Sequence, residues 1–186
     1  MRLCLTILGL IFLAGCGSSP KTHFYTLETV PGATGRHSLS YPVQLTAVHV
    51  PPSLDRRQMV SMTGANQVAI SETNQWSAPL DIMMRNILAA DLVSRLSRDR
   101  VILPDAPAPE GTATLVVTIT SFAPEAGGGL RFAGSWSLLR GGNPVRERQF
   151  QFRRQVPGNP DSTASAMSVM LGQLADQIAA ALAGTD

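Results

Sequence analysis

The chain has 186 residues, with 15 Lys and Arg against 13 Asp and Glu, and a formal net charge of +2. A near-neutral chain with 15% charged residues is not built to neutralise phosphates, so nucleic acid is excluded as a partner. At 44% hydrophobic residues the composition excludes a disordered chain, and the length suits a single domain.

The N-terminus predicts a bacterial lipoprotein. Arg2 precedes an apolar run, 3–13, which has the length of a signal-peptide core and is too short to cross a membrane. The sequence Leu-Ala-Gly-Cys at 13–16 resembles a lipobox, in which small residues precede the cleavage site and the thiol of Cys16 carries diacylglycerol. An ordinary secreted protein with a cysteine near its cleavage site is the alternative. We expect residues 1–15 to be removed as a signal peptide.

The expected acylation determines which thiols remain in the mature protein, and the residue after Cys16 indicates which membrane holds it. Cys4 leaves with the signal and Cys16 is consumed, so no thiol remains for a disulfide, a nucleophile or a metal. Residue 17 is Gly, whereas inner-membrane retention resembles a rule that requires Asp there, so we expect anchoring at the periplasmic face of the outer membrane. Residues 16–23 form the lipidated tether. No later stretch is expected to be long and apolar enough to anchor the chain.

The expected domain spans 24–183 and opens with strands. Residues 24–27 are a short β-prone stretch, and 43–50 is an apolar strand of the type found inside a sheet. Two further strands, within 58–72, flank a hairpin turn at 64–67.

An amphipathic helix is predicted from Ser77 to about Arg98. Ser77 is the expected N-cap, and Pro79 lies in the first turn, where its missing N–H costs little. The apolar stripe comprises Leu80, Met84, Ile87, Leu88, Leu92 and Leu96. Two i,i+4 ion pairs, Asp81–Arg85 and Asp91–Arg95, are expected on its surface and contribute ~0.2–0.5 kcal/mol each.

The second half of the chain predicts a short strand, an antiparallel meander and a second helix. The short strand is 101–103, and three alternating strands then follow, separated by glycine turns at 127–129 and 141–143. The arginines beside Phe150 and Phe152 are typical of an edge strand, with a groove for an acidic ligand as the alternative.

Residues 160–162 are expected to cap the second helix, whose buried stripe is Met167, Met170, Leu171, Leu174, Ile178 and Leu182. The fold class is α/β: a single domain with a central mixed β-sheet, a C-terminal-half antiparallel meander and two long amphipathic helices packed on it.

No sequence motif of catalysis is found. The chain has no nucleophile elbow, phosphate loop or His-Glu-x-x-His motif, and a hairpin turn explains the triple glycine at 127–129 better than a phosphate cradle does. His23, His37 and His49 fall in the tether, a loop and a strand end, which does not support a metal or catalytic site. We therefore expect no catalytic residue, no cofactor, no metal and no enzymatic activity.

Several motifs together resemble one known family. The densest are Val-Pro-Pro-Ser-Leu-Asp-Arg at 50–56 and Gln-Trp-Ser-Ala-Pro-Leu at 75–80, with Cys-Gly-Ser-Ser-Pro at 16–20 and Phe-Tyr-Thr-Leu at 24–27. They resemble the ABC-type transport auxiliary lipoproteins of the PqiC type, over 16–183. The family commonly has a positive residue where Gln75 stands and an acidic one where Ala78 stands.

The resemblance implies an α/β domain and an accessory role in moving lipids or other hydrophobic molecules between the inner and outer membranes. The implied partners are an MCE-domain protein that forms a hydrophobic conduit, an inner-membrane permease and its ATPase. Several copies of the chain forming a ring are also implied, whereas catalytic residues are not. The alternatives are a periplasmic lipoprotein hydrolase acting on the cell envelope and a purely structural envelope lipoprotein.

The segment 51–57 and Trp76 are the candidate docking residues. Pro51 and Pro52 cannot donate to a strand ladder, so the segment is expected at an exposed strand end. A rigid loop that presents Leu54 beside Arg56 and Arg57 suits docking, while a simple chain reversal is the alternative.

Trp76 is expected to pack on the start of the helix as a hydrophobic staple, with partner docking as the alternative.

Overall fold

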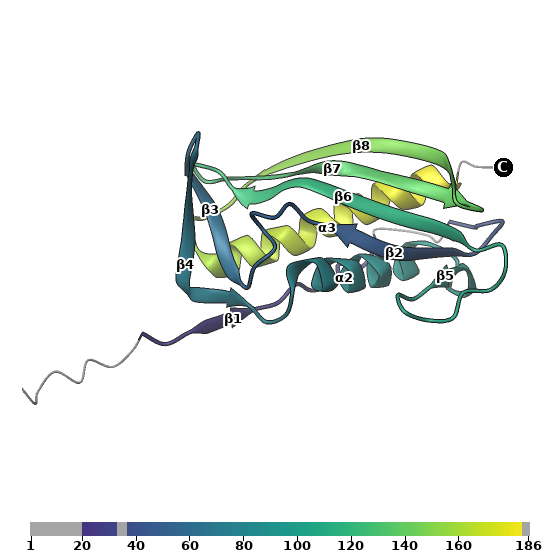
Figure 1. Cartoon of the computed structure of the whole chain (residues 1–186), viewed down its shortest axis with the longest axis horizontal. Helices are drawn as coiled ribbons and strands as arrows, with labels where there is room; N and C mark the ends of the chain where they lie inside the picture. Colours follow the sequence, from purple (N-terminus) through teal and green to yellow (C-terminus); the bar gives the residue numbers. More distant parts are fainter. Residues whose placement is uncertain (1–19, 33–36, 184–186) are drawn as a thin grey trace, which may run out of the picture.

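The computed structural model describes residues 20–32 and 37–183, and the predicted signal peptide and the predicted lipidation site, Cys16, lie outside the described residues. Within these ranges the elements form one α/β domain with two sheets and two long helices (Figure 1). In chain order they are β1 (His23–Tyr25), β2 (Val43–His49), β3 (Gln58–Gly64), β4 (Gln67–Trp76), α2 (Leu80–Arg95), η2 (Arg98–Arg100), β5 (Val101–Ile102), β6 (Ala113–Pro124), β7 (Gly129–Arg140), β8 (Asn143–Gln155) and α3 (Pro160–Ala183).

The larger sheet has five strands in the order β5-β2-β6-β7-β8. β2 is parallel to both of its neighbours, and β6, β7 and β8 form the predicted antiparallel meander, so the sheet is mixed. The prediction that 43–50 lies inside a sheet and that the arginine-rich strand β8 is an edge is confirmed. Successive side chains of a strand point to opposite faces of the sheet, and along β7 the buried apolar side chains occupy alternate positions. One face of β7 is therefore apolar, and this face is directed toward the helices.

The remaining strands form a second sheet, in the order β1-β4-β3, where the sequence predicts a single sheet. The two prolines end β2, and a tight turn follows in which the Leu54 N–H donates to the Pro51 carbonyl at 2.8 Å. The β3–β4 hairpin therefore leaves the main sheet and pairs with the N-terminal strand, so that Tyr25 lies beside Trp76.

The turns of the meander are those that the glycines predict. Gly127 and Gly128 adopt φ of +96° and +85° between β6 and β7, a conformation that disfavours residues with a Cβ. Gly134 serves a different purpose in β7: a Cβ there would collide with the carbonyl oxygen of Thr118 beside the bulge in β6.

Both helix starts differ from the prediction. Pro79 occupies the N-cap of α2 without a side-chain cap bond, and the Ser77 hydroxyl instead lies 3.6 Å from the Met83 sulfur. α2 ends at Arg95, because Leu96 is extended. The cap of α3 is Asn159, whose Oδ1 accepts the Ser162 N–H at 2.8 Å.

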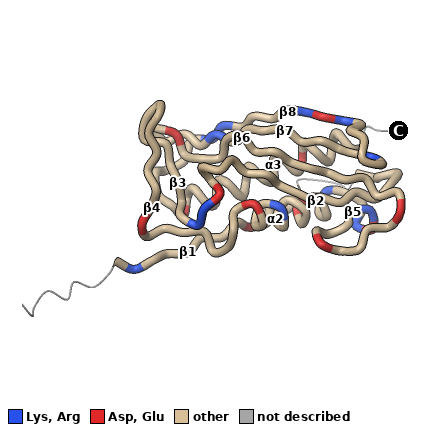
Figure 2. Tube along the Cα trace, viewed as in Figure 1, with Lys and Arg blue, Asp and Glu red and all other residues tan. Residues whose placement is uncertain are grey.

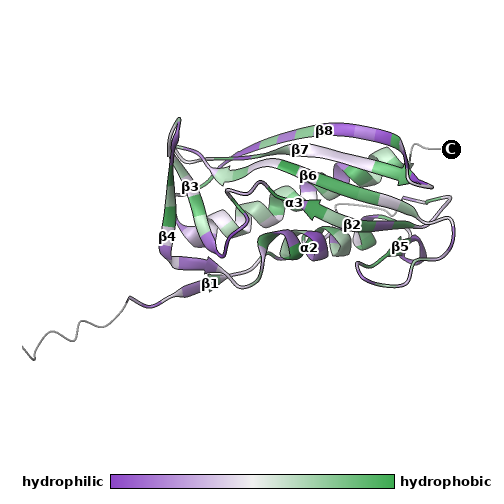
Figure 3. Cartoon of the chain, viewed as in Figure 1, coloured by the Kyte–Doolittle hydropathy of each residue, from purple (hydrophilic) through white to green (hydrophobic). Residues whose placement is uncertain are grey.

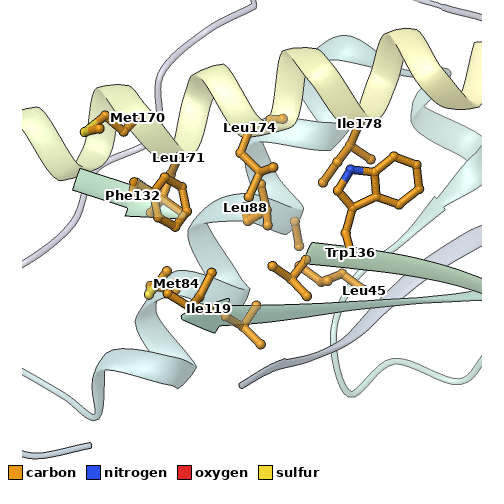
Figure 4. Close-up of a cluster of buried hydrophobic side chains, with 14 of the residues drawn as sticks. Leu45, Met84, Leu88, Ile119, Phe132, Trp136, Met170, Leu171, Leu174 and Ile178 are labelled. Atoms are coloured by element: carbon orange, nitrogen blue, oxygen red, sulfur yellow. The ribbon is translucent and has the colours of Figure 1, made fainter. Parts of the chain in front are cut away.

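The core lies between the larger sheet and the helices α2 and α3. Figure 4 shows Phe132 and Trp136 of β7 facing Leu171 and Ile178 of α3, and Figure 3 shows apolar stretches along β2, β6 and α3. Burial of these side chains is the main stabilising term of the fold.

α3 corrects one expectation about the membrane. Its 24 residues are long and apolar enough to cross a bilayer, whereas the sequence predicted no such stretch after the expected signal peptide. In its most apolar stretch, 61% is buried inside the domain. α3 is therefore the central core helix of this fold, packed against α2, β7 and β8.

Candidate functional site

The predicted docking loop is only partly exposed. Pro52, Arg56 and Arg57 are exposed, and the Arg57 guanidinium lies 5.9 Å from the centre of the Phe24 ring. Leu54 is only 7% exposed, so the expectation that it projects into solvent is wrong. The turn that begins at Pro51 directs the leucine inward, and the exposed residues of the loop are Pro52, Ser53, Asp55, Arg56 and Arg57.

Trp76 is a core residue at 4% exposure. With Leu54, Leu80, Phe122 and Met167 it surrounds a very small internal cavity of about 10 Å³. Since α2 begins at Leu80 after a Pro79 cap, Trp76 packs near the helix start, but not from the position of a hydrophobic staple. It supports the 51–57 loop from inside.

Replacing Trp76 with alanine removes a buried aromatic side chain from this cluster. We expect the free energy of unfolding to fall by ~3–5 kcal/mol. Urea denaturation followed by circular dichroism measures the change, and Trp76→Phe, which retains an aromatic ring, is the matched control and loses less. A loss below ~1 kcal/mol for the alanine variant would contradict the packing described above.

A buried charge cluster joins the two helices to the N-terminal segment. Asp91 and Arg95 of α2 are 1% and 4% exposed and lie 3.8 Å apart, so the predicted pair exists but is buried rather than at the surface. Arg95 Nε donates to Asp176 of α3 at 2.5 Å. The other predicted pair is wrong, because Arg85 bonds to Asp105 at 2.6 Å instead of to Asp81.

This cluster holds the backbone that leads from the tether into the domain. The Val30 N–H donates to Asp91 Oδ1 at 2.8 Å, and the Val30 carbonyl accepts from Arg95 at 2.8 Å. Gly32 leaves room for the arginine, since a Cβ there would lie 2.8 Å from Arg95 Cγ. The Glu28 N–H donates to the Ser168 hydroxyl at 3.0 Å, so α3 holds the same segment.

The burial of Asp91 makes the stability of the folded protein depend on pH. Burial raises the pKa of Asp91 from 3.8 to about 6, against the opposing effects of the Val30 N–H and the Arg95 guanidinium. Between these two values the folded protein binds more protons than the unfolded chain. The stabilisation from the protonated carboxyl is therefore complete below about pH 4 and lost as the pH rises to about 6.

Comparison of the wild type with Asp91→Asn tests this dependence, because the amide oxygen still accepts the Val30 N–H but does not titrate. At about 1.4 kcal/mol per pKa unit, we expect the wild type to lose roughly 2–3 kcal/mol of unfolding free energy relative to the variant between pH 4 and pH 7. Urea unfolding at several pH values measures the difference. A difference that is flat, or that favours the wild type as the pH rises, would contradict a raised pKa.

An apolar groove of about 350 Å³ is a feature that the sequence did not predict. It lies between the β3–β4 hairpin, the end of β6 and the turn before α3. Its apolar lining includes Met59, Val60, Met62, Ile70, Pro124 and Val156. Glu125 is the one acidic or basic side chain among its lining residues, and it is paired with Arg131 at 3.0 Å. The groove therefore suits an apolar ligand or side chain and offers no acid–base pair.

Over residues 20–32 and 37–183, no group of three or more His, Cys, Asp or Glu side chains is placed to hold a metal ion. His23 begins β1, and His49 ends β2 in the other sheet.

Comparison with known proteins identifies relatives over nearly the whole chain. Residues 25–179 match the family described as "ABC-type transport auxiliary lipoprotein component". The chain is 29% identical over 180 residues to "Intermembrane transport lipoprotein PqiC" of Escherichia coli strain K12, which covers 92% of this chain and 91% of that protein. The protein of the same name in Shigella flexneri gives the same values.

Two crystal structures share the fold. One, of an uncharacterized protein, has a TM-score of 0.75 and 24% identity and covers 88% of this chain and 99% of that one. The other, of a Xanthomonas campestris protein, has a TM-score of 0.68 and 12% identity and covers 86% and 93%. At such identities the likeness establishes the fold alone.

Proposed function

The chain belongs to the family of ABC-type transport auxiliary lipoproteins, and from this we propose that it is a non-enzymatic, outer-membrane lipoprotein subunit of an MCE/ABC-type system. In this role, acylated Cys16 holds the domain at the periplasmic face of the outer membrane. The domain acts as an adaptor for an MCE-domain protein, which connects it to an inner-membrane permease and ATPase. The cargo is lipid or another hydrophobic molecule moving between the two membranes.

The observation that carries the proposal is the family match over 25–179, which spans almost the whole described domain. The relative in Escherichia coli is named as an intermembrane transport lipoprotein, which supports the same role. The anchoring of the 28–32 segment by both helices fits this role as well, because a force on the tether then reaches the core directly.

A hydrolase would need a nucleophile with a base, or two carboxylates facing one cleft. The groove has one acidic side chain, which forms an ion pair, and the buried Asp91 is engaged by the backbone of Val30. These contacts favour a binding or adaptor role over catalysis.

The exposed part of the 51–57 loop is the proposed docking surface. Pro52 is rigid, and exposed Arg56 and Arg57 can form ion pairs with acidic groups of a partner. Leu54 and Trp76 act indirectly, because their packing fixes the shape of the loop.

The variant Arg56→Glu/Arg57→Glu tests this surface without disturbing the core. We expect it to fold and to remain membrane-bound, but to capture the MCE-domain partner with an affinity reduced by about tenfold or more, because charge reversal makes the contact repulsive. The matched control is Arg153→Glu/Arg154→Glu on the exposed edge strand β8 (Figure 2). Undiminished capture by the 56/57 variant would place the docking surface elsewhere.

A further inference from the structure

The β3–β4 hairpin exposes apolar residues on a strand with a free edge. Val68 and Ile70 of β4 are 48% and 45% exposed. β1 pairs only with residues 74–76 of β4, so from Gln67 to Glu72 one edge of β4 has no neighbouring strand in the described sheet. The sequence from Gln58 to Ser71 contains no charged residue.

This combination is unusual for a surface strand. Edge strands are commonly protected by charged side chains or prolines, as β8 is by its arginines. Exposed apolar side chains on an unprotected edge indicate a surface that is covered in the working protein.

The tether indicates what covers it. Six residues lie between Cys16 and His23, and an extended chain over these seven Cα-to-Cα steps reaches at most ~25 Å. His23 lies beside Asn74 of the same strand β4. In Figure 1 the hairpin and the start of β1 lie at one end of the molecule, and β5 and the β7–β8 turn lie at the other. A lipid on Cys16 therefore brings the hairpin end of the domain to the membrane.

We propose that the β3–β4 hairpin is a second, non-covalent membrane contact, in which Val68 and Ile70 lie in the interfacial region of the bilayer that holds the acylated Cys16. The inference rests on the acylation in the proposed function. Two attachments on one side fix the orientation of the domain, with β5 and the β7–β8 turn directed away from the bilayer. Figure 3 shows the apolar stretches of the hairpin at this end.

Site-specific labelling of the full lipidated protein tests the contact. The chain has two cysteines: Cys4 is removed with the signal, and the Cys16 sulfur is blocked by lipid. A cysteine introduced by Val68→Cys or Ile70→Cys is then the single free thiol for an environment-sensitive NBD dye. Matched controls are Leu103→Cys and Val145→Cys, since both residues are 54% exposed and lie after β5 and at the start of β8, at the opposite end.

The labelled proteins are reconstituted in vesicles of phosphatidylethanolamine and phosphatidylglycerol, with and without lipids that carry a nitroxide on the acyl chain. We expect a blue shift of the dye emission and quenching by the nitroxide at positions 68 and 70, and neither at 103 and 145. Equal, water-like emission at all four positions in vesicle-bound protein overturns the inference while leaving the lipid anchor intact.

Two further outcomes also overturn the inference. In the first, the blue shift at positions 68 and 70 depends on the density of the protein in the vesicles, and the nitroxide does not quench the dye. This result shows that a second copy of the chain, not lipid, covers the strand. In the second, the full-length protein does not float with the vesicles. The lipid anchor in the proposed function is then wrong, and the hairpin contact, which rests on that anchor, is wrong as well. Flotation therefore distinguishes the failure of the anchor from the failure of the hairpin contact.

Discussion

Replacing Cys16 with alanine releases the protein from the membrane fraction. The change removes the thiol that we propose carries the diacylglycerol, and stable attachment depends on several acyl chains. α3 is apolar enough to cross a bilayer, but its apolar residues form the core, so it does not substitute for the lipid while the domain is folded. Fractionation of cell envelopes, with metabolic labelling by a fatty acid, measures both effects.

The matched control is Cys4→Ala, since that residue lies inside the predicted signal peptide and its loss is expected to leave acylation unchanged. The Cys16 variant is examined in cells that lack the MCE, permease and ATPase partners, because a partner could retain the protein. Membrane association of the Cys16 variant under these conditions would contradict the lipoprotein assignment.

Replacing Arg95 with methionine destabilises the domain by ~3–5 kcal/mol. The guanidinium is the cation that faces the buried Asp91 carboxylate, and it also bonds to Asp176 and to the Val30 carbonyl. Methionine fills a similar space but leaves a buried acid and a backbone oxygen without these bonds. Urea denaturation measures the loss, and limited proteolysis of the 20–32 segment reports the release of the N-terminal chain.

Arg85→Met is the matched control on the same helix, because its partner Asp105 is exposed, and such pairs contribute at most about 1 kcal/mol. The double variant Asp91→Asn/Arg95→Met is expected to lose less than Arg95→Met alone, since it no longer buries an uncompensated charge. Equal losses for Arg95→Met and Arg85→Met would show that burial gives Arg95 no special role.

The parts of the fold that the sequence predicted depend on local patterns. Alternating apolar residues from 113 to 155, with glycines at the two turns, predict an antiparallel meander, and the structure confirms it. The stripe from Leu80 to Leu96 predicted α2 to within a few residues of its end. Neighbouring glycines between two strand patterns predict a hairpin turn, because such turns need a positive φ, which other residues rarely adopt.

The parts that it did not predict depend on contacts between distant residues. The second sheet includes the pairing of β1 with β4, across about 50 residues, and no local pattern reports that pairing. The inward orientation of Leu54 follows from a turn whose hydrogen bonds are not visible in the composition of the loop. Asn159 could have been identified as a cap, because it directly precedes a proline at the first helical position.

The buried cluster had one signal in the sequence. Asp91 stands between Leu88 and Leu92 within the apolar stripe of α2, and a charge at such a position indicates either a surface edge or a buried network. To choose between these two possibilities, one must know that the segment around Val30 packs against α2, and only the tertiary structure shows this contact. The groove and the free edge of β4 are likewise products of how the hairpin is placed against β6 and α3.

The central claim is that this chain is the membrane-anchored adaptor of an MCE/ABC-type transport system. Affinity capture of the full-length, acylated protein from detergent-solubilised envelopes, with the captured proteins identified by mass spectrometry, tests it most directly. The account predicts co-capture of an MCE-domain protein together with a permease and an ATPase, and loss of all three with Arg56→Glu/Arg57→Glu. Acylated, membrane-bound protein that captures none of the three, even after chemical cross-linking in intact cells, would contradict it.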